Sequence, residues 1–215
     1  MYFPYGETEI EYLRARDGRL GEVIDRIGRV DRAVDTDLFS SVVRHIIGQQ
    51  ISTKAQQTVW RRLRAALGEV TPETVRGAEA EDLRALGMSL RKAERIRDFS
   101  DRVARGEFDL AAVARMPDAE AIAALTSLRG VGVWTAEMIL LFCLRRPDVF
   151  SFGDLGIRRG LRMLCRREID RALFEEYRRR FSPYGSVASL YLWAVSGGAL
   201  PELAEGAPPG GVTPP

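Results

Sequence analysis

The sequence contains few of the residues from which metal centres and disulfide frameworks are built. It has only two cysteines, Cys143 and Cys165, and one histidine, His45. These three side chains cannot supply the four protein ligands of a structural zinc ion or of a four-cysteine iron–sulfur cluster, so we exclude both within the chain. Each cysteine lies in an apolar stretch, which predicts buried thiols in a reducing compartment rather than a disulfide framework.

The sequence also lacks a long hydrophobic run. No apolar stretch approaches the ~20 residues that a transmembrane helix requires. The first residues, MYFPYGETEIEY, have neither the basic nor the apolar part of a secretory signal peptide. These absences predict a cytoplasmic protein without a membrane partner, and we expect it to be a monomer.

Net charge is small, because 32 lysine and arginine residues are balanced by 30 aspartate and glutamate residues, leaving a formal charge of +2. Bulk charge therefore does not by itself indicate a nucleic-acid partner. Only Lys54 and Lys92 are lysines, so nearly all the positive charge is guanidinium, the group that pairs bidentately with phosphates and carboxylates. A compositionally biased genome would give the same arginine excess, so both explanations stay open.

Alternating strand patterns are almost absent, and short amphipathic segments separated by glycine, proline and capping residues predict an all-α fold. The chain of 215 residues, 46% of them hydrophobic, is long enough to bury a sizeable core. Residues 201–215 are rich in proline and glycine, which predicts a disordered tail. Helices are expected at about 8–16, 19–28, 36–48, 52–67, 72–78, 80–86, 89–105, 109–115, 118–128, 134–145, 154–165, 168–180 and 186–196.

A double-glycine turn stands out in the string TSLRGVGVWTAEM, where one predicted helix ends near Leu128 and the next begins near Trp134. Glycine permits positive φ and the close approach of another backbone. The unpaired amides that begin the second helix form an anion site that fits a phosphate. For a bare GxG, an ordinary tight connection between two helices is the alternative.

An isolated acid, Asp154, follows the apolar helix in the string SFGDLGIRRGL. It lies at an expected helix N-terminus, where the helix dipole favours an ionised carboxylate. Aspartate is also a common N-cap, so on this evidence alone a purely structural role is the alternative.

The whole string LRGVGVWTAEMILL resembles the hairpin of the helix-hairpin-helix DNA glycosylase superfamily, whose usual form is LPGVGxxTA, with Arg129 in place of the proline. In that superfamily an acid begins the next helix about twenty residues beyond the turn, and Asp154 stands there. HIIGQQISTKAQQTV (45–59) and GMSLRKAERIRDFS (87–100) resemble the DNA-3-methyladenine glycosylase II branch. The resemblance covers about residues 36–196.

The resemblance implies a two-lobed helical bundle with its active site in the interlobe cleft and no N-terminal β domain of the kind found in the long bacterial form. Residues 36–144 would form a central lobe that carries the helix-hairpin-helix at about 118–145. Residues 1–35 and 145–200 would form the second lobe.

The resemblance further implies a monofunctional base-excision-repair enzyme of the nucleoid. It would flip alkylated purines, such as 3-methyladenine and 7-methylguanine, out of damaged double-stranded DNA and hydrolyse the N-glycosidic bond, leaving an abasic site. Asp154 would be the catalytic anion, since cleavage of this bond builds positive charge on the deoxyribose. Trp134 occupies the position of the Schiff-base lysine of bifunctional members, and an indole cannot perform lyase chemistry.

Three side chains are implied to line the base pocket: Trp134, Trp193 and Met138. An N3- or N7-alkylated purine is cationic and is attracted to a π face. Packing in the core is the alternative for Trp193 and Met138.

Further residues are implied to bind DNA or an ion. The amides of Gly130, Gly132 and Thr135 would hold a phosphate, and the carbonyls of Thr126, Leu128 and Val131 a sodium or potassium ion, with no other cofactor required. By family position, the wedge that fills the gap left by the flipped base is Gln50, with Gln49 or Ile51 beside it. Arg158 and Arg159 would meet phosphates, unless they form only a solvated helix face.

Two other functions remain open at this stage. An endonuclease III-like glycosylase/lyase is disfavoured by Trp134 in the lysine position and by the missing cysteine cluster. A helix-hairpin-helix DNA-binding module without activity is the alternative from another class.

Overall fold

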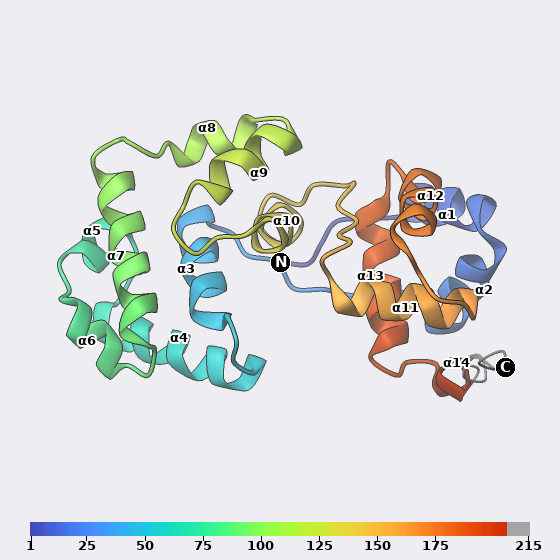
Figure 1. The fold of residues 1–215 in the computed structure, drawn as a ribbon, viewed down its shortest axis with the longest axis horizontal. Helices are drawn as coiled ribbons and strands as arrows, with labels where there is room; N and C mark the ends of the chain where they lie inside the picture. The colour runs from blue at the N-terminus through green and yellow to red at the C-terminus, as the bar shows by residue number, and fades with distance from the viewer. Residues whose placement is uncertain (206–215) are drawn as a thin grey trace, which may run out of the picture. The chain divides into compact units, whose positions relative to one another are not determined.

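The computed structural model describes residues 1–205 and confirms the predicted all-α fold (Figure 1). Within that range the only strand-like pairing is an isolated bridge between Tyr2 and Ala33. No helix of the described part has the length and apolar character needed to cross a membrane. The helices divide between two compact units, one formed by Val34–Leu144 with Met1, the other by Tyr2–Ala33 and the chain from Arg145 onward.

The first unit is built around one apolar helix. Its helices are α3 (Leu38–Gly48), α4 (Thr53–Leu67), α5 (Pro72–Arg76), α6 (Ala80–Ala85), α7 (Leu90–Ala104), α8 (Leu110–Arg115), α9 (Asp118–Thr126) and α10 (Val133–Phe142). Helix α3 contacts α4, α7, α8 and α10. Phe39 and Val43 of α3 are buried, and the ring of Phe39 stacks on that of Phe99 in α7 with 5.0 Å between centroids. This core holds both the end of α3 and the start of α10 in place.

The second unit depends on one close helix crossing. Its helices are α1 (Glu7–Arg16), α2 (Gly18–Ile27), α11 (Leu155–Cys165), α12 (Arg171–Phe181), α13 (Gly185–Ser196) and α14 (Pro201–Glu205). At Gly160 of α11 a Cβ atom would lie 2.1 Å from the carbonyl oxygen of Leu192 in α13. Only glycine allows the two backbones to approach so closely. The crossing therefore fixes where residues near the start of α11 meet residues of α13.

Polar side chains set the helix boundaries, as the sequence predicts. Asp17, Ser52, Thr71 and Ser89 each accept a hydrogen bond from a backbone amide in the first turn of the following helix. Such caps satisfy amide donors that a helix leaves unpaired. The helices that the sequence predicts consequently begin within about three residues of their expected starts.

The expected disordered tail is wrong over its first five residues. Pro201–Glu205 forms helix α14, and an ion pair joins Glu202 to Arg26 of α2. Leu200 just before it is 6% exposed, so burial anchors the segment where composition alone predicted none. Residues 206–215 lie outside the described residues. Both cysteines are buried, as predicted, and neither forms a disulfide.

Candidate active site and DNA-binding elements

The glycine turn joins α9 to α10 in a conformation that depends on Gly130. This residue has φ +87°, in the left-handed region that favours glycine. A Cβ atom there would also lie 2.7 Å from the side chain of Arg95, which comes from α7. The backbone conformation therefore favours glycine at this position, and its lack of a side chain lets Arg95 lie over the turn.

Helix α10 begins with a residue that has no side chain to cap it. Gly132 is the N-cap, with φ −93° and ψ 173°, so the N-cap residue supplies no side-chain acceptor for the first-turn amides. Thr135, the third residue of the helix, is buried at 5% exposure. Because amides at a helix N-terminus attract anions, the phosphate site predicted at Gly130, Gly132 and Thr135 stays a prediction for this turn.

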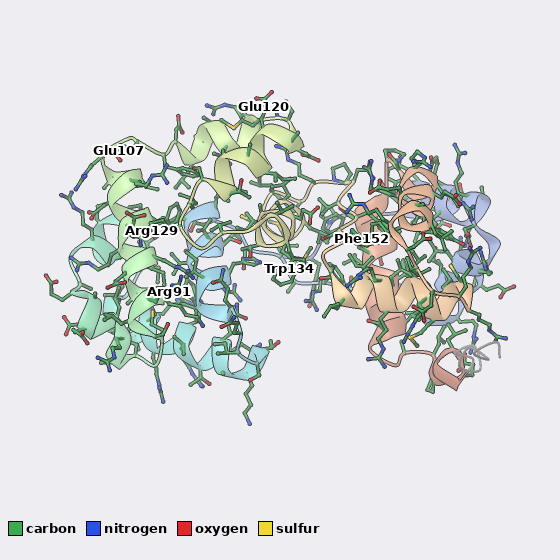
Figure 2. The ribbon with its side chains drawn as sticks, viewed as in Figure 1. Arg91, Glu107, Glu120, Arg129, Trp134 and Phe152 are labelled. Atoms are coloured by element: carbon green, nitrogen blue, oxygen red, sulfur yellow. The ribbon has the colours of Figure 1, made fainter. Side chains whose placement is uncertain are left out.

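Two predicted pocket residues of α10 lie in different environments. Trp134 is 44% exposed and extends from the second position of the helix (Figure 2). Met138, one turn later, is 3% exposed and packs in the core of the first unit. Trp134 is thus partly exposed, whereas Met138 contributes to the helix packing beneath it.

Asp154 of the second unit is a buried carboxylate at the N-cap of α11. It is 6% exposed, and its Oδ1 accepts a hydrogen bond from the amide of Ile157 at 2.8 Å. The same oxygen accepts a second hydrogen bond from Nε1 of Trp193, also at 2.8 Å. These two donors fix the orientation of the carboxylate.

Trp193 therefore has a contact that the sequence did not suggest. It was expected to offer a ring face to a base, and in the structure its indole N–H is bonded to the carboxylate. Gly156 makes this contact sterically feasible, because a Cβ there would lie 2.7 Å from Cδ1 and 3.0 Å from Nε1 of the indole. Glycine at the second position of α11 thus leaves room for the Trp193 ring beside Asp154.

Two arginines pack on the ring of Phe152, two residues before Asp154. The guanidinium carbons of Arg158 and Arg171 lie 5.0 Å and 4.7 Å from the centroid of the Phe152 ring. The Nε atom of Arg158 is buried and finds no hydrogen-bond acceptor among residues 1–205. Arg159, the neighbouring predicted phosphate ligand, is exposed. The start of α11 thus presents positive charge close to the candidate catalytic acid.

The corner between α3 and α4, Gly48–Ser52, separates the two glutamines of the predicted wedge. Gln50 is exposed and has φ +58°, an uncommon conformation for a residue with a side chain. Gln49 points inward, and its Nε2 donates a hydrogen bond to the carbonyl of Gly130 at 2.6 Å. Ile51 is 39% exposed. The structure therefore leaves Gln50 and Ile51 accessible and commits Gln49 to the glycine turn.

The three carbonyls predicted to bind a monovalent ion come from the end of α9 and the turn. Thr126 is the last residue of α9, and the carbonyl of Leu128 accepts a hydrogen bond from the amide of Val131 at 3.1 Å. A carbonyl oxygen has two lone pairs, so this bond leaves Leu128 one position for an ion. Neutral oxygen donors of this kind fit sodium or potassium. In the described residues no cluster of three or more histidine, cysteine or acidic side chains offers a different kind of metal site.

The sequence reasoning missed two functional candidates on α7, Lys92 and Arg95. Nζ of Lys92 donates hydrogen bonds to the carbonyls of Ile47 and Gln49, both at 2.7 Å. Arg95 covers Gly130, and its Nη1 lies 3.4 Å from Oε1 of Gln49. The rarity of lysine in this chain was a usable signal for Lys92, whereas nothing in the sequence distinguishes Arg95 from the other arginines.

A cavity of about 710 Å³ opens elsewhere on the first unit, near the start of α3. Its lining includes Asp35, Arg44 and Trp60, and none of the predicted site residues is among its lining residues. Asp35 and Arg44 form an ion pair, and the guanidinium of Arg44 lies 5.4 Å from the Trp60 ring. These side chains satisfy one another, and the cavity lies apart from the candidate residues of the first unit.

One family model matches most of the chain. Residues 43–182 match the model described as HhH-GPD superfamily base excision DNA repair protein. DNA-3-methyladenine glycosylase 1 of Schizosaccharomyces pombe is 31% identical over 164 residues, which cover 74% of this chain and 72% of that protein. DNA-3-methyladenine glycosylase 2 of Escherichia coli is 27% identical over 172 residues. The chain spans about three fifths of the length of this and two other bacterial relatives.

Solved structures agree with the sequence comparison. The crystal structure of DNA-3-methyladenine glycosidase from Bacillus halodurans is 33% identical, with a TM-score of 0.84 over 95% of this chain and 98% of that one. The S. pombe 3-methyladenine DNA glycosylase Mag1 in complex with abasic DNA is 27% identical, with a TM-score of 0.79 over 88% and 97% of the two chains.

Proposed function

The chain belongs to the HhH-GPD superfamily of base excision DNA repair proteins, and we propose that it excises alkylated purines from duplex DNA. The proposed substrates are bases of the 3-methyladenine and 7-methylguanine type, and the product is an abasic site. The proposal rests mainly on Asp154, a buried carboxylate fixed by two donors beside an arginine-rich surface. The names and DNA-bound structures of the relatives support this substrate class.

In the proposed reaction, the C1′–N bond of the nucleotide breaks and its electron pair goes to the purine. A purine that is already cationic leaves as a neutral base, so this step needs little acid catalysis. Asp154 stabilises the positive charge that builds on the deoxyribose, because a fixed anion in a poorly hydrated site interacts strongly with it. Water then adds at C1′ and releases one proton to the solvent.

The positions of the two lysines support the proposal that the enzyme is monofunctional. A lyase needs an amine at the sugar, and Trp134 occupies the family position for it. The chain has two lysines, and Lys92 already donates to two backbone carbonyls while Lys54 is exposed on α4. We infer that water, and not a protein amine, attacks the sugar.

We further propose that the glycine turn holds the DNA backbone. The amides of Gly130, Gly132 and Thr135 would bind a phosphate, and the carbonyls of Thr126, Leu128 and Val131 would hold a sodium or potassium ion, which when bound adds positive charge at the phosphate. Exchanging sodium and potassium for a bulky organic cation at constant ionic strength should then weaken duplex binding. We propose a monomer that acts on the nucleoid in the cytoplasm.

A glycosylase assay on a duplex oligonucleotide with one 7-methylguanine tests the main proposal. Wild type should release the base, and alkali should be required to cleave the strand. Asp154→Asn should lose at least about 100-fold in single-turnover rate, since asparagine keeps the helix cap but not the charge. Asp170→Asn is the matched control, because Asp170 caps α12 through the same bond to the third amide of the helix, 2.8 Å long.

The alternatives predict different outcomes in the same assay. Strand cleavage without alkali would indicate the glycosylase/lyase. Binding of duplex DNA without base release from any alkylated purine would indicate a DNA-binding module. Undiminished release by Asp154→Asn would remove the role assigned to that residue.

A further inference from the structure

The corner that carries the predicted wedge is held by hydrogen bonds from distant elements. Lys92 of α7 lies 45 residues from Ile47 and 43 from Gln49 in sequence, yet its ammonium binds both of their carbonyls at 2.7 Å. These carbonyls belong to the last turn of α3 and to its C-cap, where a helix leaves its acceptors unpaired. Lys92 thus caps α3 and fixes the chain just before Gln50.

The same corner is also tied to the glycine turn. The side-chain amide of Gln49 donates to the carbonyl of Gly130 at 2.6 Å, and its oxygen faces Nη1 of Arg95 at 3.4 Å. Arg95 in turn lies directly over Gly130, which has no side chain to obstruct it. Lys92 therefore holds the backbone of Gln49, and the side chain of Gln49 holds the turn.

A side chain of α4, Gln56, packs beside the start of the corner. Nε2 of Gln56 donates to the carbonyl of Arg44 at 2.8 Å, and a Cβ at Gly48 would lie 2.5 Å from that same nitrogen. Glycine at position 48 thus admits the Gln56 amide. Lys92 and Arg95 of α7 thus bond to Gln49, and the Gln56 amide of α4 packs against Gly48 at the start of the corner.

These restraints are costly to build, which indicates that the position of the corner matters. Burial is the main cause that lowers the pKa of Lys92, and the nearby charge of Arg95 lowers it further. Gln50 beside it is held in the left-handed region, which residues other than glycine rarely adopt. A glycine C-cap would end α3 without burying a lysine ammonium and without a left-handed backbone at a residue that has a side chain.

We propose that Lys92 and Gln49 are positioning residues for base flipping. They lock the corner Gly48–Ser52 to the glycine turn, so that the exposed Gln50 is presented at a fixed position relative to the proposed phosphate site. This inference rests on the proposed function. A wedge held in place before binding loses little conformational freedom when it enters the duplex, which favours opening of the base pair.

The role of these residues in base flipping can be isolated by comparing release rates from a paired lesion and from an unpaired lesion. Single-turnover release of 7-methylguanine is measured opposite cytosine and opposite an abasic-site analogue, where no base pair must be opened. Lys92→Met should slow release from the paired lesion by about 10- to 100-fold, the order of loss that misplacement by about 1 Å causes. Release from the unpaired lesion should fall much less.

Gln49→Leu breaks the link between the corner and the glycine turn at Gln49. This second variant keeps the proposal testable if Lys92→Met does not fold. It removes the side-chain bonds to Gly130 and Arg95 but leaves the carbonyl that Lys92 binds. Arg91→Met is the matched control, since Arg91 is an exposed cation on the same helix (Figure 2). Its paired-to-unpaired rate ratio should equal that of wild type.

The outcomes separate the two proposals. Wild-type release with an altered rate ratio in Lys92→Met or Gln49→Leu, and not in Arg91→Met, supports the positioning role. Equal loss on both lesions, or no loss in either variant, overturns it while the proposed function stands. No release by wild type overturns the proposed function and this inference together.

Discussion

The indole Nε1 of Trp193 donates a hydrogen bond to Oδ1 of Asp154 across 2.8 Å, joining the last turn of α13 to the N-cap of α11. The two residues are 39 positions apart in sequence. Their contact depends on the close crossing at Gly160 and on the absence of a side chain at Gly156. The candidate catalytic carboxylate is therefore oriented by helix packing as well as by its own helix.

Trp193→Phe should slow base release while leaving a ring in place. A hydrogen bond to a charged group contributes about 1.5–3 kcal/mol, which corresponds to roughly 10- to 100-fold in rate if the bond is needed to orient the carboxylate. Single-turnover kinetics and duplex affinity, measured together, check this. Wild-type rates in the phenylalanine variant would mean that only the ring of Trp193 matters.

Gly156→Ala should reduce activity without unfolding the protein. The new methyl group would push the indole away from Asp154, because its ideal position lies 2.7 Å from Cδ1 of Trp193. Alanine otherwise suits a helix better than glycine does. Gly18→Ala in the first turn of α2, where nothing lies within 4 Å of the added atom, is the control and should retain full activity. Kinetics and thermal unfolding of both variants provide the test, and normal kinetics in Gly156→Ala would contradict it.

Two substitutions at Gln50 should separate stability from wedge function. Both Gln50→Ala and Gln50→Gly remove the long side chain and should slow release of a paired lesion. The left-handed backbone at φ +58° costs a residue with a Cβ roughly 1–2 kcal/mol, a cost that glycine escapes. The glycine variant should therefore exceed the alanine variant in free energy of unfolding by about 1 kcal/mol in urea titrations. An alanine variant at least as stable as the glycine variant would argue against strain at this corner.

The stability of the protein should fall as pH drops below about 6.5, the ordinary histidine pKa. Burial is the main cause that lowers the pKa of His45, and its Nδ1 lies 2.8 Å from the carbonyl of Ser41. Below pH 6.5 the unfolded chain takes up a proton that the folded chain does not, so the free energy of unfolding decreases by at most about 1.4 kcal/mol per pH unit.

His45 is the only histidine in the chain, so this slope can be assigned to it. Urea titrations of wild type and His45→Gln between about pH 5 and 7 provide the measurement. The slope should disappear in the variant, whatever its absolute stability. A slope that persists would have to come from another group.

Much of the fold follows from local sequence signals. Ser52 and Gly68 bound α4, and Thr71 with Pro72 begins α5, because capping side chains and backbone preferences act over a few residues. The sequence missed α14, since a five-residue helix has little stability of its own. Its position depends on the burial of Leu200 and on the ion pair between Glu202 and Arg26.

The sequence by itself determined the all-α class, because helical patterning recurs along the chain. It also determined the glycine turn, the acid at the start of α11 and the family, because each depends on a short local motif. The contacts of Trp193, Gln49 and Lys92 were decided only by the tertiary structure. Each of these side chains reaches a partner at least 39 residues away. No periodicity or spacing encodes such a contact, since it depends on how closely whole helices approach one another.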